Sequence, residues 1–253
     1  MTVDAAAYLG AWPFRPIEGT VAGLRKMMRT ERVQQALVSP LEGLFYADPR
    51  PANDRLLRRL SGGRSLWAVP VVNLRLADWR DELARMAGRR RVRGMRLAPG
   101  FHGYRVEEAR EALVAAAEHD LAVVIQVRMQ DERHHHLPTQ RAEEAPLEDI
   151  VALAAAAPES RVVASGARLA ETLEQAEHIR QLANIWLDMS HMDGLDCMKE
   201  AAQAVGVRHL AFATNWPFFC ARSAVLKVGE AELRDRDATA VMERNARIAF
   251  GLE

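Results

Sequence analysis

The sequence predicts a (β/α)8 barrel, in which eight parallel strands alternate with helices. Three observations support this fold. Short apolar, β-rich runs alternate with helical patterns, eight such runs are present, and the chain of 253 residues has the length of one barrel. Because no linker or low-complexity segment interrupts the alternation, we expect a single domain over residues 1–253. A composition that is 49% hydrophobic and 27% charged suits a core of that size.

Each expected strand is short, apolar and followed by a segment long enough for a helix. The strands cover residues 3–9, 33–39, 66–73, 92–98, 121–127, 161–165, 184–189 and 209–214. In the segment 106–120, apolar residues recur at the spacing of one helical face. The alternative fold is an open doubly wound sheet, which is less favoured because no glycine-rich phosphate loop follows any strand.

Charge and cysteine content restrict the expected partners and location. Lys+Arg and Asp+Glu number 34 each, so neither a nucleic acid nor an anionic membrane is expected as the main partner. The two cysteines, Cys197 and Cys220, are far apart and form no CxxC motif. With no leader-like N-terminal pattern and no apolar run of about 18 residues, we expect a cytoplasmic protein that acts on a small molecule. Homo-oligomerisation is left open.

Two segments carry a resemblance to a known family. The segment 209–219, HLAFATNWPFF, resembles the last-strand pattern (L/V)-(L/F)-F-G-(T/S)-D-x-P-F of amidohydrolase-related proteins. The segment 92–104, VRGMRLAPGFHGY, resembles their pattern V-R-G-(V/I)-(K/R)-L-x-P-x-x-x-G-Y. The resemblance extends along almost the whole chain. It implies a metal-dependent-hydrolase-like barrel with its site at the carboxyl ends of the strands.

The resemblance also implies a divalent metal, but the chain departs from the family's ligands. The positions of the family's four histidines and one aspartate are occupied here by Ala6, Tyr8, Gln126, Ser165 and Asn215. A mononuclear site needs three or four N or O ligands, and these side chains are poor substitutes. We therefore expect no metal cofactor.

The loop after the fifth strand contains three consecutive histidines. Before it, Gln126 and Arg128 alternate onto one strand face and should point inward together. On an extended segment only His134 and His136 lie on the same side, and two ligands are too few for a metal without a third. The sequence leaves open a relocated metal site, a solvated loop, or an acid/base cluster facing a substrate.

Arg96 lies in the fourth expected strand, on the same face as Gly94 and Ala98. A long cation inside a barrel needs an anionic partner. That partner is either an acid of the chain, such as Asp188 or Asp4, or the carboxylate of a substrate. The sequence favours neither alternative.

Candidates for proton transfer follow the fourth and seventh strands. His102 lies on a glycine-flanked loop, where it is either a surface histidine or an imidazole over the mouth. Asp188 and Ser190 share a strand face, and His191 begins the next loop. We favour an Asp188 and His191 general-base pair. A Ser-His-Asp relay is disfavoured, because residues this close in sequence do not easily form it and no GxSxG turn exposes the serine.

Aromatic residues follow both the first and the last strand, which should meet where the barrel closes. They are Tyr8, Trp12 and Phe14, and Trp216, Phe218 and Phe219. They either pack this seam or recognise a ring-bearing substrate.

Three functions are compatible with these residues. We favour a hydrolase or lyase of amidohydrolase type that acts, without a metal, on a small carboxylated substrate with a cyclic or aromatic body. Arg96 and Arg128 would hold the anion, the histidines and Asp188 would move protons, and Gln126 and Asn215 would donate to an oxyanion. The alternatives are a non-catalytic barrel that binds a ligand or a partner, and a metal enzyme with its site rebuilt near the histidine run.

Overall fold

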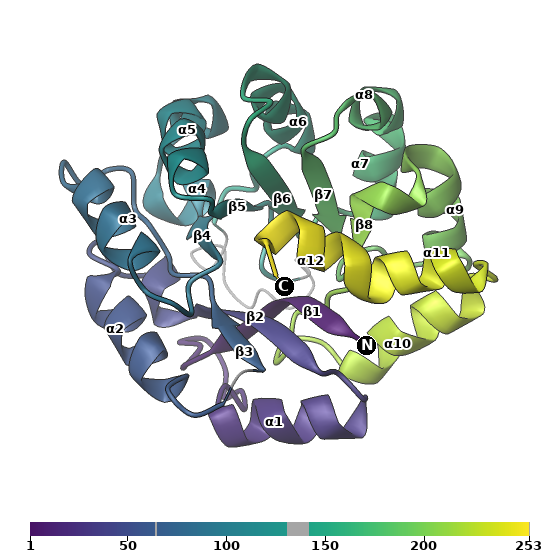
Figure 1. Cartoon of the computed structure of the whole chain (residues 1–253), viewed down its shortest axis with the longest axis horizontal. Coiled ribbons are helices and arrows are strands. Elements are labelled where there is room, and N and C mark those ends of the chain that lie inside the picture. The colour runs from purple at the N-terminus through teal and green to yellow at the C-terminus, as the bar shows by residue number, and fades with distance from the viewer. Residues whose placement is uncertain (64, 131–141, 253) are drawn as a thin grey trace.

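The computed structural model describes residues 1–63, 65–130 and 142–252 and confirms the barrel (Figure 1). Parallel strands pair in the orders β1-β2-β3 and β4-β5-β6-β7-β8. The strands are β1 (Val3–Leu9), β2 (Gln35–Pro40), β3 (Leu66–Ala68), β4 (Gly94–Leu97), β5 (Ala122–Gln126), β6 (Arg161–Ser165), β7 (Ile185–Asp188) and β8 (Leu210–Ala211).

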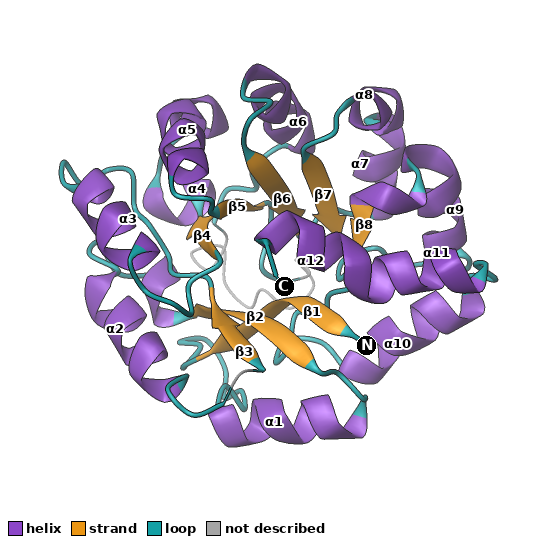
Figure 2. Cartoon of the chain, in the orientation of Figure 1, coloured by secondary structure: helices purple, strands orange, loops and turns teal. Residues whose placement is uncertain are grey.

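Most helices surround the strands on the outside of the barrel, and α12 (Asn245–Phe250) lies across one end of it (Figure 2). The expected helix over 106–120 forms as a 3-10 turn followed by α5, which buries Ala112, Leu113 and Ala116. The helices are α1 (Val21–Thr30), α2 (Arg50–Arg59), α3 (Trp79–Ala87), α4 (Pro99–His102), α5 (Arg110–Glu118), α6 (Leu147–Ala156), α7 (Leu169–Glu174), α8 (Ala176–Gln181), α9 (Cys197–Val205), α10 (Ala221–Glu230), α11 (Asp235–Thr239) and α12 (Asn245–Phe250). Shorter turns are η1 (Glu42–Leu44), η2 (Val106–Ala109), η5 (Val207–His209) and the π-helical η6 (Ala240–Arg244). In the described part of the chain, no helix is long and apolar enough to cross a membrane.

Isolated bridges join the two sheets into a closed barrel. They pair Ala68 with Val92, Val71 with Arg96, and Ala7 with Trp216. Backbone hydrogen bonds close the seam between the first and last strands, because Ala5 N donates to Phe212 O and Tyr8 N donates to Trp216 O, both at 2.8 Å. Side chains at the carboxyl ends of β1 and β8 are therefore neighbours.

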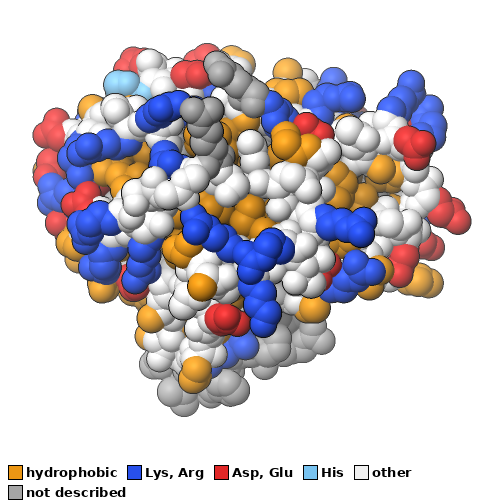
Figure 3. Space-filling model, turned by 60° about the horizontal axis from the view of Figure 1, so that its bottom comes forward, with side chains coloured by type: hydrophobic (Ala, Val, Ile, Leu, Met, Phe, Trp, Pro, Cys, Tyr) orange, Lys and Arg blue, Asp and Glu red, His pale blue; other side chains and the backbone are white. Residues whose placement is uncertain are grey.

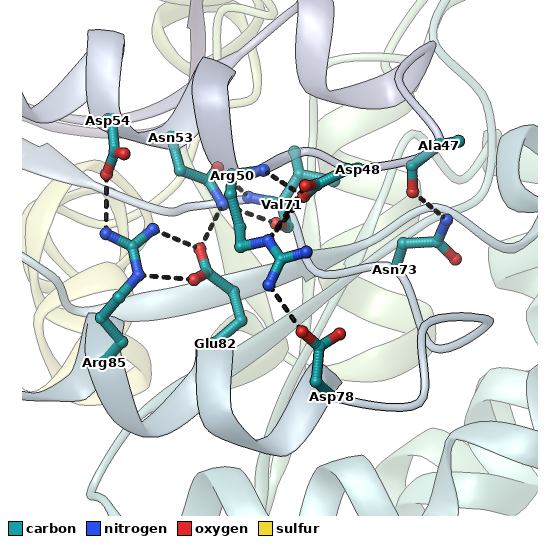
Figure 4. A network of polar contacts seen from close by, with 10 residues as sticks. All are labelled: Ala47, Asp48, Arg50, Asn53, Asp54, Val71, Asn73, Asp78, Glu82 and Arg85. Carbon is teal, nitrogen blue, oxygen red and sulfur yellow. Dashed lines mark hydrogen bonds and ion pairs between the residues drawn. The ribbon is translucent and has the colours of Figure 1, made fainter.

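The third expected strand is shorter than its apolar run suggests. Pro70 has no N–H for a ladder bond, and β3 ends at Ala68. Asn53 of α2 then takes over the pairing: its Oδ1 accepts from Val71 N and its Nδ2 donates to Val71 O, both at 2.9 Å (Figure 4). Glu82 accepts a further bond from Asn53 Nδ2 at 3.0 Å. The side chain of Asn53 thus holds Val71 beside β4. Two residues further on, Asn73 Nδ2 donates to Ala47 O at 2.8 Å.

A buried carboxyl group also ties the closing seam together. Asp4 Oδ1 accepts from Thr214 N at 3.0 Å and from Ala6 N at 3.1 Å, and its Oδ2 accepts from Thr214 Oγ1 at 2.6 Å. The side chain is fully buried. Burial raises the pKa of Asp4 to about 7, although the hydrogen bonds from Thr214 and Ala6 oppose this shift.

Asp4 should make stability fall as pH rises through the neutral range. An unfolded aspartate has a pKa of about 3.9, while the folded one has a pKa of about 7. The stabilisation from the neutral carboxyl is therefore complete below pH about 4 and is lost as pH rises through about 7. As pH rises from about 4 to about 7, we expect the unfolding free energy of Asp4→Asn, measured in urea, to increase relative to that of wild type. A difference between the two proteins that is constant with pH would contradict the assignment.

Candidate functional site

The guanidinium of Arg96 is buried in the interior of the barrel, with only 1% of the residue exposed. Its Nε donates to Ser39 Oγ at 2.8 Å, and its Nη1 donates to Ser165 Oγ at 3.2 Å and to Gln126 Oε1. The guanidinium carbon lies 4.8 Å from the ring centroid of Tyr8. Arg96 is thus held by neutral oxygen atoms of β2, β5 and β6 and by an aromatic face of β1.

An ion pair between Arg96 and an acid of the barrel, one of the two alternatives left open by the sequence, does not form within residues 1–63, 65–130 and 142–252. Asp4 is bound by Thr214, and Asp188 Oδ1 accepts from Ser190 N and Ser190 Oγ. Of the two alternatives that the sequence left open for Arg96, the ion pair with Asp4 or Asp188 is the one that the structure excludes, because hydroxyl and amide oxygens take the place of a carboxylate around this cation.

The other inward-facing polar side chains join the same network. Tyr8 Oη donates to Gln126 Oε1 at 2.9 Å, and Gln126 Nε2 donates to Ser165 O at 3.3 Å and to Arg128 O. Asn215 instead donates from Nδ2 to Met129 O at 2.9 Å. Its amide therefore holds the segment after β5 across the barrel, and only its Oδ1 remains without a partner among the described residues.

The mouth above Arg96 is filled by apolar side chains. A buried cluster packs there, made of Tyr8, Trp12, Leu41, Leu44, Val71, Ala98, Met129 and Phe218. The ring centroids of Trp12 and Phe218 are 4.8 Å apart, and those of Tyr8 and Phe218 are 6.0 Å apart. The cavity between Trp12 and Gln126 is only about 20 Å³. Trp216 is buried in the seam itself, where its N donates to Thr214 Oγ1 at 3.1 Å. The aromatic residues thus pack this seam in the structure.

Arg128 is not available to grip a substrate anion. Its Nε and Nη2 donate to Glu144 at 3.0 and 2.8 Å, its Nη1 donates to Gly166 O at 2.7 Å and to Glu171 at 2.8 Å, and its Nη2 also binds Glu171. A guanidinium has five N–H donors, and all five are used. The predicted anion-holding role of Arg128 is therefore wrong. No local pattern indicated Glu144 and Glu171 as partners, since they lie 16 and 43 residues away along the chain.

Of the histidines predicted after the fourth and fifth strands, His102 is described by the structure, whereas His134 and His136 are not. His102 Nε2 lies 3.3 Å from Gly43 O, and its ring stacks on Tyr104. Burial lowers the pKa of His102. It thus packs against the η1 turn. His134 and His136 lie outside the described residues, so their proposed roles in proton transfer or metal binding stay predictions.

Ser190 lies between Asp188 and His191. Ser190 Oγ donates to Asp188 Oδ1 at 2.5 Å and is 3.0 Å from His191 Nδ1. Because a hydroxyl has one proton, Nδ1 must carry its own hydrogen and donate to Ser190 Oγ. The three residues do make contact, against our expectation, but in the order Asp-Ser-His. Ser190 therefore orients the imidazole and is not a nucleophile activated by it.

This tautomer leaves His191 Nε2 as a hydrogen-bond acceptor. The atom is buried and has no partner among the described residues, and the same holds for Asp188 Oδ2. Burial lowers the pKa of His191 to about 4, outweighing the opposite effect of Asp188. His191 is therefore neutral at pH 7 with a free lone pair, as a general base requires.

His191 faces a groove of about 570 Å³ beside the filled mouth. This groove, the His191 groove, is lined by Ser190 and His191, the aromatic side chains of Phe218 and Phe219, and two cations, Arg168 and Lys227. Lys227 Nζ binds Asp193 at 2.6 Å, and Asp193 itself is 67% exposed. Sequence reasoning did not select Lys227 or Arg168, because neither follows a strand directly.

Comparison with known proteins places the chain in a family. The model of the Amidohydrolase family matches residues 42–252, so the chain belongs to the amidohydrolase family. No curated protein matches it significantly. Solved structures of similar fold include 2,6-dihydroxybenzoate decarboxylase from Rhizobium, at 15% identity and a TM-score of 0.77, covering 99% of this chain and 98% of that one. Another is 5-carboxyvanillate decarboxylase from Sphingomonas paucimobilis, at 14% identity and a TM-score of 0.79, covering 100% and 99%.

One comparison overturns the expectation that no metal cofactor is used. A dihydroxybenzoic acid decarboxylase from Polaromonas is similar over 99% of this chain and 97% of its own, at 12% identity and a TM-score of 0.75, and it carries bound manganese. The prediction of an absent metal is wrong in the light of that structure.

The residues at the expected ligand positions are occupied by other contacts. Tyr8, Gln126 and Ser165 are engaged with Arg96 and with each other. Among the described residues, no group of three or more His, Cys, Asp or Glu side chains could hold a metal ion. The side chains at these strand ends therefore do not fit a metal ion.

Arg128 should contribute to stability. Its side chain is 3% exposed and pairs with two carboxylates that are 37% and 28% exposed. Removing one member of a buried pair costs about 3 to 5 kcal/mol, less where the partners are hydrated. We expect Arg128→Met to lower the unfolding free energy by about 2 to 4 kcal/mol in urea denaturation. Arg105→Met, which removes an exposed pair with Glu107, is the control and should cost less than about 1 kcal/mol. Equal losses would contradict the structural role of Arg128.

Proposed function

We propose that this amidohydrolase-family protein is a hydrolase or lyase that acts on a small aromatic carboxylate in the His191 groove. The observation that carries the proposal is His191 itself: the residue lines a cavity large enough for one aromatic ring, and its buried Nε2 has no partner among the described residues. The similar structures from Rhizobium and Sphingomonas are decarboxylases of aromatic acids, which supports the same substrate class.

The walls of the groove suit such a substrate. Phe218 and Phe219 offer aromatic surface, and the ring of His191 meets that of Phe219 at 4.8 Å between centroids. Lys227 would bind the substrate carboxylate, because its present partner, Asp193, is hydrated and easily displaced. Arg168 is a second cation on the groove, and its nearest carboxylate oxygen, on Glu144, is 3.9 Å away.

His191 would move the proton. In hydrolysis its Nε2 would take a proton from the water that attacks an acyl carbon and would give it to the leaving group as the bond to that group breaks. In a lyase reaction it would take a proton from a substrate hydroxyl and give it to the ring carbon that bears the carboxylate, and the bond between them would then break with release of CO2. Ser190 Oγ accepts from Nδ1–H and keeps the lone pair on Nε2. Asp188, hydrogen-bonded to Ser190, favours the imidazolium that forms after transfer.

Lys227 should be required for carboxylate binding. We expect 2,6-dihydroxybenzoate to raise the melting temperature of wild type, and turnover to be detectable by loss of its absorbance with Mn²⁺ present. Lys227→Met should raise KM at least tenfold, because the carboxylate loses its cation. The matched control is Lys199→Met, since Lys199 forms an ion pair of the same length, 2.6 Å, on the outside of the barrel. Identical kinetics for the two variants, or no binding by wild type of any hydroxybenzoate tested, would refute the proposal.

The pH profile should report the unusual pKa of His191. A base with a pKa of about 4 stays neutral and active well below pH 6.5, so kcat/KM should hold constant down to pH about 5 and fall toward pH 4. Circular dichroism at each pH separates loss of activity from unfolding. A descending limb centred near pH 6.5 in folded protein would show that His191 is not the base.

A further inference from the structure

A second large cavity lies at the amino ends of β7 and β8, on the opposite side of the barrel from the His191 groove. It has a volume of about 670 Å³ and lies between the end of α8, the α9 to β8 connection, and α11, η6 and α12. Four arginines line it, Arg180, Arg208, Arg236 and Arg244. We call it the arginine cavity. Its apolar lining includes Ile248, which is 53% exposed.

These four arginines lie close together in a part of the chain that carries more acidic than basic residues. Residues 1–93 hold 17 of the 34 Lys and Arg and only 9 of the 34 Asp and Glu. Figure 3 shows many basic and few acidic side chains across the middle of the face on which α1 lies. Residues 94–253 are acidic overall, with 17 basic and 25 acidic residues. Four arginines around one cavity in the acidic part need a local explanation.

The acidic lining of the cavity neutralises these four arginines only in part. Asp237 is the one acidic residue among the described residues that line it. Its Oδ2 already accepts from Arg234 Nε at 2.7 Å, and its Oδ1 is 3.5 Å from Arg236 Nε. Like charges around one space repel each other. The cavity therefore favours an anion.

Two of the four arginines also have a structural task. Arg208 Nη2 donates to Arg180 O at 2.7 Å and its Nε donates to His209 Nε2 at 3.0 Å. His209 Nδ1 lies 2.9 Å from Ile185 O, and burial lowers the pKa of His209, so its neutral ring accepts from Arg208. Arg180 binds Gln203 O. Capping of backbone carbonyls thus accounts for Arg180 and Arg208. Arg236 shares Asp237 with Arg234 at 3.5 Å, and the position of Arg244 is left unexplained.

The backbone places Arg244 at the cavity in an unusual way. Arg244 ends the π-helical turn η6, and such turns occur frequently at functional sites. The next residue, Asn245, donates from Nδ2 to Val207 O and Leu210 O, both at 2.7 Å, and so fixes this turn to the start of β8. Among the described residues, the Arg244 side chain has no carboxylate within 4.0 Å.

We propose that the arginine cavity is a second binding site, for a small amphiphilic anion. A phosphate or carboxylate head would be held by Arg236 and Arg244, with Arg208 beside them, and an alkyl or aromatic body would cover Ile248. The inference does not depend on the proposed activity at His191.

Isothermal titration calorimetry with octyl phosphate and with octanoate, both below their micellar concentrations, tests the site and distinguishes its headgroup. We expect one mole of at least one of the two to bind per mole of wild type. Arg236→Gln combined with Arg244→Gln should weaken that binding at least tenfold, and Ile248→Glu, which places a carboxylate at the cavity, should abolish it. All three substituted positions are solvent-exposed, so these variants should keep the wild-type melting temperature.

Two controls make the result specific. Arg29→Gln removes one exposed arginine from α1 and should bind as wild type does. His191→Gln should also retain the binding, because the arginine cavity is separate from the His191 groove. Absence of binding to wild type, or equal affinity in wild type and in Ile248→Glu, would overturn the proposal. Loss of binding in His191→Gln would move the ligand to the His191 groove and overturn it as well.

Discussion

The burial of the Arg96 guanidinium without a carboxylate partner is the constraint on which the interior of this barrel depends. Removing a guanidinium from water is costly, and here neutral acceptors and a ring face offset that cost. The guanidinium donates hydrogen bonds to side-chain oxygen atoms of Ser39, Ser165 and Gln126. The ring of Tyr8 covers it, and the Tyr8 hydroxyl donates to Gln126. Polar side chains from the ends of four strands, β1, β2, β5 and β6, therefore contact Arg96 or each other.

These hydrogen bonds restrict where a substrate could bind, because they occupy the polar side chains on the barrel axis. Once Arg96 is satisfied from within, the mouth above it can close with apolar side chains, and Met129 is held there by Asn215. An unfilled position remains beside β7 and β8, where His191 lines a groove of about 570 Å³ and its Nε2 has no partner among the described residues. The site that we propose therefore lies at the carboxyl ends of the strands, to one side of the barrel axis.

The fold and the inward direction of Arg96 could be predicted because strand periodicity fixes both. The partners of a side chain could not, since they depend on loops whose paths the pattern does not encode. Arg128 illustrates this: it shares a strand face with Gln126, yet Glu144 and Glu171 reach it from the segments before α6 and within α7. The contact of Ser190 with His191 was missed for the same reason, because it depends on the turn that follows β7. Pro70, by contrast, was visible in the sequence and should have shortened the third strand.

Three cations of this barrel differ in what they can still bind. Arg96 has only neutral partners but lies beneath a filled mouth, so its charge is out of reach. Arg128 uses all five donors on Gly166 and two carboxylates. Lys227 has one carboxylate partner, which is itself hydrated and therefore weakly held. A substrate anion binds most readily to the cation whose present carboxylate partner is displaced at the lowest free-energy cost. Lys227, in the same groove as His191, is therefore the cation best suited to bind it.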